Sequence, residues 1–128
     1  MIIDDSPVVR KILEVCFSRA GLSWVSFPDG AQALAALKQP FVPSAIVLDI
    51  HLPDMDGLAI VRLLRSNKSF DETAIIILTG YDSFLSRLRA KRAGVDCFLS
   101  KPFRVTDLLA TISRYARKGE AYAGPTNT

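Results

Sequence analysis

The sequence of 128 residues is poor in the residues that cross-link small domains or bind soft metals. It has two cysteines, Cys16 and Cys97, and a single histidine, His51. The cysteines are far apart and form no Cys-x-x-Cys pair, so we expect buried free thiols in a reducing compartment. Two distant cysteines and one histidine are also too few ligands for a zinc site. The sequence therefore argues against a disulfide scaffold and a zinc protein.

Long hydrophobic runs are also lacking. The longest one, residues 74–78, is far shorter than the ~20 residues that span a bilayer. The first five residues carry neither a basic leader nor a long apolar stretch, so no signal peptide is visible. We expect a cytoplasmic protein without membrane contact. Because 49% of its residues are hydrophobic, we predict one folded domain over residues 1–118 and a flexible tail or linker over 119–128.

The chain has little net charge, +3, which is too small to indicate nucleic-acid binding. The distribution of charge says more. Residues 1–60 hold 4 Lys and Arg against 7 Asp and Glu, whereas the remainder holds 12 against 6. This asymmetry predicts a localised acidic site and is compatible with a basic surface elsewhere. Because the net charge is small and no helix-turn-helix follows Arg117, we expect no direct contact of this chain with nucleic acid.

Short apolar runs alternate with segments of helical period along the chain. The runs predict strands at 2–3, 23–27, 45–48, 74–78 and 95–99, and the helical pattern predicts helices at 8–20, 30–37, 58–64, 84–94 and 105–116. The middle strands are apolar on both faces, which is typical of a parallel sheet covered by helices on both sides. We therefore predict an α/β fold, a doubly wound, flavodoxin-like parallel sheet of five strands in the order 2-1-3-4-5 with five helices.

Polar side chains stand directly after four of the predicted strands. Asp4 and Asp5 follow the first strand, Asp49 the third, Thr79 the fourth and Lys101 the fifth. Ligands of doubly wound sheets bind at the carboxyl ends of the strands, so we expect these five residues to share one site. Clustered carboxylates repel one another and offer only oxygen ligands, which favours Mg²⁺ as the cofactor.

The same five residues suit phosphoryl transfer, in which positioning and charge carry most of the catalysis. Asp49 is central among the strands and is the natural nucleophile. Lys101 offers a cation and Thr79 a hydroxyl donor for the phosphoryl oxygens. Asp54 and Asp56 are expected to be loop and turn residues rather than ligands.

The sequence resembles the receiver domain of two-component response regulators, in order from residue 1 to about 117. The resemblance rests on the paired acids 4–5, the loop 49–57 (Asp-Ile-His-Leu-Pro-Asp-Met-Asp-Gly), Thr79-Gly80, and the Lys-Pro-Phe ending at 101–103. Each piece alone is weak, but together and in this strand context they are highly specific. The resemblance implies the receiver fold and a signalling switch rather than an ordinary enzyme. Such a switch catalyses only its own phosphoryl transfer and slow dephosphorylation.

The resemblance also implies a role for each site residue. Asp49 would accept a phosphoryl group from the phosphohistidine of a sensor histidine kinase or a histidine phosphotransfer protein. Asp5, Asp49 and the backbone carbonyl of His51 would bind Mg²⁺, with Asp4 acting mostly through water. Lys101 and Thr79 would hold the phosphoryl oxygens.

The resemblance further implies how the signal leaves the site. Thr79 would move inward, and Phe98, three positions before Lys101, would turn into the space that it leaves. The surface of the fourth helix, fifth strand and fifth helix would then change and control an output domain or effector protein. A homodimer through the fourth and fifth helices is compatible with this scheme.

Two departures from the family pattern stand out. Only three residues precede the paired acids, which is barely a strand, so we expect a trimmed start and some loss of stability. His51 and Tyr81 occupy the positions two after Asp49 and two after Thr79, which in relatives tune the loss of the phosphoryl group. A bulky Tyr81 is expected to shield the site and prolong the phosphorylated state.

Some of these residues, and the function as a whole, have alternative interpretations. Asp5 could simply cap the helix that starts near Ser6, and His51 is better explained as a rim residue than as an imidazole ligand. A phosphatase of the haloacid dehalogenase kind needs an acid two residues after its nucleophile, where this chain has His51. A receiver-like module that has lost phosphorylation would not need the complete acid, threonine and lysine set.

Overall fold

The computed structural model describes residues 1–38 and 40–116, so the predicted boundary at 118 and the predicted tail lie outside the described residues. Its elements, in chain order, are β1 Ile2–Ile3, α1 Pro7–Arg19, β2 Ser26–Phe27, α2 Gly30–Leu37, β3 Ala45–Leu48, α3 Gly57–Arg65, the 3-10 helix η1 Lys68–Phe70, β4 Ala74–Thr79, α4 Phe84–Ala93, β5 Cys97–Ser100 and α5 Val105–Ala116. Among the described residues, no helix has the length and apolar character needed to cross a membrane.

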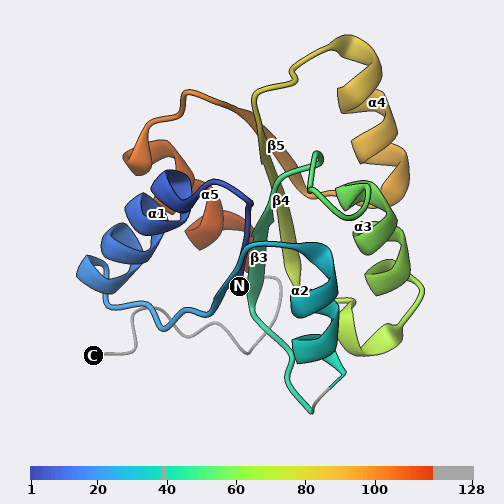
Figure 1. Cartoon of the computed structure of the whole chain (residues 1–128), viewed down its shortest axis with the longest axis horizontal. Helices are drawn as coiled ribbons and strands as arrows, with labels where there is room; N and C mark the ends of the chain where they lie inside the picture. The colour runs from blue at the N-terminus through green and yellow to red at the C-terminus, as the bar shows by residue number, and fades with distance from the viewer. Residues whose placement is uncertain (39, 117–128) are drawn as a thin grey trace.

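The five strands form one parallel sheet in the order β2-β1-β3-β4-β5, which confirms the predicted topology. Helices α1 and α5 cover one face of the sheet, and α2, α3 and α4 cover the other (Figure 1). Parallel strands of one sheet are joined by crossover connections. Here each crossover contains a helix, and these helices lie on both faces of the sheet. The carboxyl ends of all five strands therefore point to one edge.

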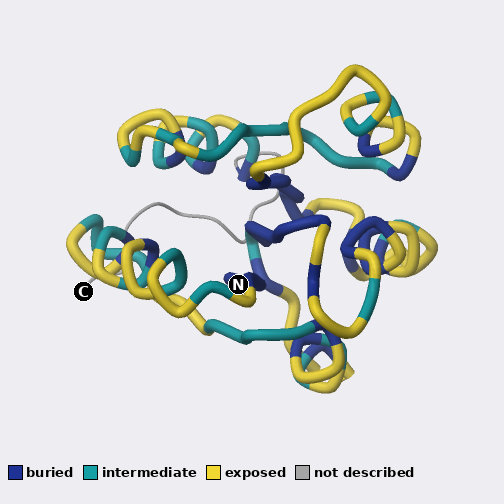
Figure 2. Tube along the Cα trace, turned by 45° about the horizontal axis from the view of Figure 1, so that its top comes forward, coloured by how far each residue is buried: buried dark blue, intermediate teal, exposed yellow. Residues whose placement is uncertain are grey.

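Strand β4, an inner strand of the sheet, is buried along its whole length, and its side chains on both faces are mostly apolar. Ile75 and Ile77 pack into the core on the α2–α3–α4 side, whereas Ile76 and Leu78 pack into the core on the α1–α5 side. Figure 2 shows this arrangement as a buried central sheet inside helices whose outer faces are exposed. A β-branched run without polar interruption forms such a strand because successive side chains alternate between the two faces.

Helix starts follow the local sequence closely. The side chain of Ser6 accepts a hydrogen bond from the amide of Val9, and Pro7 occupies the first turn of α1. The carboxylate of Asp29 accepts from the amide of Gln32 at the start of α2. The alternative that Asp5 caps α1 is thus wrong, because Ser6 fills that position.

Two local predictions need correction. The second strand was predicted over 23–27, but β2 pairs with β1 only at Ser26 and Phe27. Cys16 and Cys97 are free, as predicted, but they are half-buried rather than buried. The helix predicted at 84–94 is present as α4, where Phe84 is 82% exposed and the buried side chains are those of Ala90 and Ala93.

Strand β1 is as short as the sequence suggests, and it is central. Ile2 and Ile3 are fully buried between β2 and β3. The amino group of Met1 is also buried and donates to the carbonyl oxygen of Ala45 at 2.8 Å. Burial disfavours its charged form and lowers the pKa of this amine to about 5.

Candidate functional site

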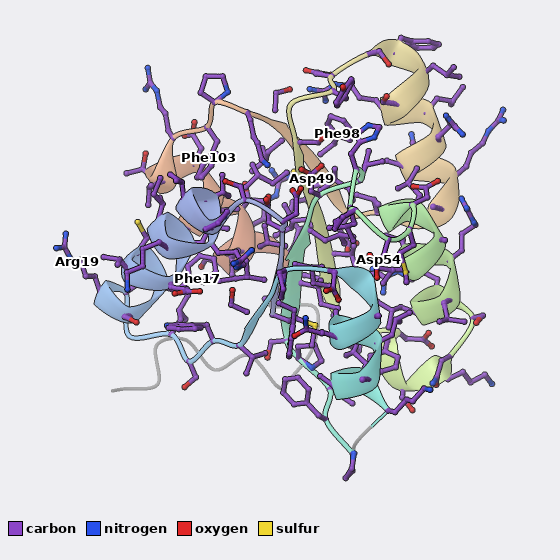
Figure 3. All side chains as sticks on the ribbon, viewed as in Figure 1. Phe17, Arg19, Asp49, Asp54, Phe98 and Phe103 are labelled. Carbon is purple, nitrogen blue, oxygen red and sulfur yellow. The ribbon has the colours of Figure 1, made fainter. Side chains whose placement is uncertain are left out.

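The predicted site residues meet at the carboxyl edge of the sheet. Asp4 and Asp5 follow β1, Asp49 follows β3, Thr79 is the last residue of β4, and Lys101 follows β5. Figure 3 shows Asp49 at the upper end of the sheet, between the helices of the two faces. Parallel strands bring residues distant in sequence to one edge, as expected from the strand order.

Three of these residues form an acidic cluster. One carboxylate oxygen each from Asp4, Asp5 and Asp49 lies within 4.8 Å of the other two. Asp4 and Asp49 are buried, with exposed fractions of 1% and 8%, whereas Asp5 is exposed. Carboxylate oxygens at this spacing, open to solvent on one side, are suited to a hard divalent cation such as Mg²⁺.

Lys101 compensates part of this negative charge. Its ammonium donates to Oδ2 of Asp4 at 2.8 Å and to Oδ2 of Asp49 at 3.1 Å. Burial alone would lower the pKa of Lys101, but the hydrogen bonds and charges of Asp4 and Asp49 outweigh it and raise the pKa. Lys101 therefore remains a cation and links two acids that would otherwise repel each other. The peptide bond that follows it, Lys101–Pro102, is cis.

Asp4 is held from a second side by the backbone. Its Oδ1 accepts from the amide of Ser6 at 2.9 Å, while its Oδ2 accepts from Lys101. Its backbone carbonyl accepts from the guanidinium of Arg10 at 2.7 Å. A carboxylate at 1% exposure needs such partners, because an unpaired buried charge is costly.

The loop after Asp49 wraps closely around this residue. The amide of His51 donates to Oδ1 of Asp49 at 3.2 Å, and the amide of Gly57 donates to the carbonyl oxygen of Ile50 at 2.6 Å. A Cβ atom at position 57 would lie 2.3 Å from the backbone oxygen of Asp49. Glycine at this position thus allows the start of α3 to pack directly against the candidate acceptor.

The other two acids of this loop have structural partners, as predicted. Asp54 accepts from the amides of Gly30 and Ala31 at the start of α2, and the Gly30 bond is the main cause that lowers its pKa. Asp56 caps α3 by accepting from the amide of Leu58 at 2.9 Å. Neither belongs to the acidic cluster.

Thr79 and two aromatic residues form the rim on the β4 side. Thr79 is fully buried, and its Oγ1 accepts from the amide of Tyr81 at 3.3 Å. The rings of His51 and Tyr81 are in contact, with centroids 4.1 Å apart and planes tilted by 49°. Tyr81 is 65% exposed and His51 is also exposed, so this pair lies at the surface of the molecule.

Phe98 lies on β5, on the side of the site that faces α4 (Figure 3). It is half-buried and packs against the core beneath α2, α3 and α4. The guanidinium of Arg87 lies over its ring, 4.7 Å from the centroid. The position fits a residue that links the site to α4.

The ionic contacts next to Phe98 were not predicted from the sequence. Arg87 donates to both carboxylate oxygens of Asp82, at 2.6 and 2.9 Å, and the hydroxyl of Ser100 also donates to Asp82. The hydrogen bonds from Arg87, then from Ser100, lower the pKa of Asp82 to about 2. Only the five-residue spacing of Asp82 and Arg87 hinted at a pair, and nothing in the sequence indicated Ser100.

Comparison with known proteins assigns this arrangement to a family. The family model of the response regulator receiver domain matches residues 1–113. PilG of Pseudomonas aeruginosa is 31% identical over 115 residues, which cover 90% of this chain and 84% of PilG. The response regulator MprA of Mycobacterium sp. is 36% identical over 125 residues, 98% of this chain but 53% of MprA. The chain thus spans about half the length of MprA.

Solved structures show the same fold. The chemotaxis response regulator CheY4 of Vibrio cholerae superposes with a TM-score of 0.82 at 29% identity, covering 89% of this chain and 94% of that one. The beryllofluoride-activated NtrC4 receiver domain dimer gives 0.82 at 27%, with 92% and 96% covered. The receiver domain of the sensor histidine kinase PA1611 of Pseudomonas aeruginosa, with a magnesium ion in its active-site cleft, gives 0.81 at 27%, with 91% and 94% covered. The chain therefore belongs to the response regulator receiver domains of two-component signalling.

Proposed function

We propose that this domain accepts a phosphoryl group on Asp49 in a reaction that depends on Mg²⁺. The observation that carries the proposal is the joint position of the acids and the lysine. Lys101 contacts both Asp4 and Asp49, and the three carboxylates lie within 4.8 Å of one another. The family membership of the chain supports the same function.

Asp5, Asp49 and the backbone carbonyl of His51 are the proposed Mg²⁺ ligands, and Asp4 acts mostly through water. The exposure of Asp5 and the two protein partners of Asp4 support this division, because Asp4 already uses one oxygen for Ser6 and the other for Lys101. The magnesium ion in the PA1611 receiver domain supports the choice of metal. When bound, Mg²⁺ supplies positive charge next to the phosphoryl oxygens.

In the proposed reaction, a carboxylate oxygen of Asp49 attacks the phosphorus atom of a phosphohistidine. The new P–O bond forms as the P–N bond breaks, and the imidazole nitrogen of the donor takes the released electron pair. Lys101 neutralises charge on the transferred group, and the hydroxyl of Thr79 donates to one of its oxygens. The domain is thus a switch that promotes its own phosphorylation and slow dephosphorylation, and Asp49 is restored by water.

The proposed partners follow from this chemistry. A sensor histidine kinase or histidine phosphotransfer protein supplies the phosphoryl group, and an output domain or effector protein reads the surface of α4, β5 and α5. Three exposed apolar side chains, Tyr81 in the loop before α4 and Phe84 and Leu85 at its start, support a protein-binding role for this surface. The dimeric NtrC4 receiver supports homodimerisation as one form of output. Signalling of this kind, together with two free cysteines, fits a cytoplasmic location.

We propose that Thr79 and Phe98 transmit the phosphorylated state to this surface. Thr79 moves toward the phosphoryl oxygens, and Phe98 turns inward behind it. Phe98 has no hydroxyl group, so its inward turn leaves no buried polar atom without a partner.

The experiment is intact-protein mass spectrometry after incubation with acetyl phosphate and Mg²⁺. We expect one phosphoryl adduct in the unaltered protein and none in Asp49→Asn or in the presence of a chelator. Asp54→Asn is the matched control, because Asp54 lies in the same loop but points its carboxylate at the start of α2. An adduct that persists in Asp49→Asn, or its absence from the folded unaltered protein, would contradict the proposal.

A further inference from the structure

The loop between β4 and α4 is fastened back onto β5 by side chains. Asp82, in this loop, accepts a hydrogen bond from the hydroxyl of Ser100 at the end of β5. Ser100 lies opposite Thr79 in the parallel pairing of β4 and β5, and the amide of Lys101 donates to the carbonyl oxygen of Thr79 at 2.8 Å. The Asp82–Ser100 bond therefore closes a small ring of backbone and side chains that contains Thr79.

The same carboxylate is also tied to α4. Arg87 donates two hydrogen bonds to it in a bidentate arrangement, the geometry in which a guanidinium restricts a carboxylate most strongly. The Arg87 guanidinium lies at the same time over the ring of Phe98. Asp82 is thus the common partner of a strand residue and a helix residue, and both contacts lie beside the phosphoryl-binding residues Thr79 and Lys101.

We propose that Asp82, Arg87 and Ser100 form a clamp that positions Thr79 and Lys101 for the incoming phosphoryl group. The inference rests on the proposed function of Asp49. The side-chain partners of Asp82 in the described part of the chain are Arg87 and Ser100, and neither Asp49 nor Lys101 is among them. Asp82 therefore acts through the loop and is a positioning residue. The side chains of Arg87 and Asp82 are 49% and 36% exposed, so their contribution to overall stability is small.

The bidentate geometry explains why these residue types are needed. A lysine at position 87 would keep the charge but could neither hold both oxygens of Asp82 in a fixed plane nor lie flat over Phe98. The pKa of Asp82, lowered to about 2 by Arg87 and Ser100, keeps the clamp charged through the physiological range. We therefore expect the clamp not to respond to pH near neutrality.

Loss of the clamp should affect phosphoryl uptake more than folding or metal binding. Small displacements of positioning groups reduce the rates of reactions that depend on alignment. We expect the second-order rate constant for adduct formation with acetyl phosphate, at saturating Mg²⁺, to fall about tenfold in Asp82→Ala. The Mg²⁺ affinity and the melting temperature should stay close to those of the unaltered protein, because the acidic cluster of Asp4, Asp5 and Asp49 is untouched.

The test compares Asp82→Ala, Arg87→Gln, the double variant and the milder Ser100→Ala. Lys91→Gln, on the exposed surface of the same helix, is the matched control and should react at the normal rate. If the three residues act as one unit, the double variant is no slower than Asp82→Ala alone. Arg87→Lys should recover little of the rate.

The outcomes separate the clamp from the proposed function. If the unaltered protein forms no adduct, the proposed function fails and the clamp fails with it. If it forms the adduct and Asp82→Ala and Ser100→Ala react within twofold of it, the clamp alone is refuted. Additive effects of Asp82→Ala and Arg87→Gln would also refute it, because independent contributions are not a clamp.

Discussion

The two ends of β1 differ in the partners that they give to a buried ionisable group. At the carboxyl end, the carboxylate of Asp4 is 1% exposed and has both oxygens occupied, one by the amide of Ser6 and one by the ammonium of Lys101. At the amino end, the buried amino group of Met1 has one carbonyl acceptor, that of Ala45. The carboxylate of Asp4 is thus paired with an ammonium group, whereas burial lowers the pKa of the Met1 amine to about 5, so that this amine is neutral at pH 7. Burial is therefore tolerated in a charged form only where the fold provides a counter-charge.

This difference separates function from structure along one short strand. The compensated end holds the acidic cluster to which we assign the cation and the phosphoryl group. The uncompensated end lowers the stability of the fold at pH values where the amine is protonated in the unfolded chain but not in the folded one. Both ends flank the same short strand, Ile2–Ile3.

The largest expected effect is at the amino end. The pKa of the Met1 amine is about 8 in the unfolded chain and about 5 in the fold, so between these values the unfolded chain binds a proton that the fold does not. The free energy of unfolding must then fall as the pH falls from 8 to 5, by up to about 4 kcal/mol. Urea unfolding at several pH values measures this slope.

A protein extended by one residue before Met1 is the control, because an amide replaces the ammonium there. It should lose most of this pH dependence. An identical slope in the two proteins would show that other groups produce it, and the contrast between the two strand ends would not hold.

The next effect concerns the cation at the carboxyl end. Mg²⁺ at about one hundred times its dissociation constant should raise the free energy of unfolding by about 2.7 kcal/mol, because only the folded chain brings the three acids together. Asp5→Asn should remove most of the increase, measured by thermal unfolding with and without Mg²⁺. Asp54→Asn should keep it, since Asp54 is bonded to α2. Equal stabilisation of Asp5→Asn and the unaltered protein would place the cation elsewhere.

The smallest expected effect is at the rim. The ring of Tyr81 contacts His51, the residue two positions after Asp49, and we expect it to limit the access of water to a phosphorylated Asp49. Tyr81→Ala should shorten the lifetime of the adduct several-fold, a change of about 1 kcal/mol in the barrier. The decay of the adduct mass after removal of acetyl phosphate measures this, with Tyr81→Phe expected to behave like the unaltered protein. An unchanged lifetime in Tyr81→Ala would remove the shielding role.

The architecture could be predicted from the sequence because it follows from periodicity, and the meeting of the candidate site residues at one edge follows from their places at strand ends. Asp49, Thr79 and Lys101 each stand directly after or at the end of an apolar run, and parallel pairing brings such positions together. The burial of Asp4 and the exposure of Asp5 could not be predicted from their position alone, because one residue reverses the side of the chain that a side chain faces.

Other features depended on tertiary packing. Trp24 and Val25 continue the alternating pattern of β2, but they lie outside the strand and are 38% and 37% exposed, although the carbonyl oxygen of Val25 accepts from the amide of Ile2 at 2.8 Å. Phe84 fits a helical pattern, yet α4 is packed through its alanines. The Asp82–Ser100 contact joins residues 18 positions apart, and its existence depends on how the loop folds back onto β5.

The most direct test of the central claim is to locate the phosphoryl group on the chain. Acyl phosphates can be trapped by borohydride reduction, which converts the modified aspartate to homoserine, and peptide mass spectrometry then identifies the position. After treatment with acetyl phosphate and Mg²⁺, we predict homoserine at position 49 and nowhere else. Homoserine at position 4 or 5, with Asp49 intact, would contradict the claim that the acid held by Lys101 and His51 is the acceptor.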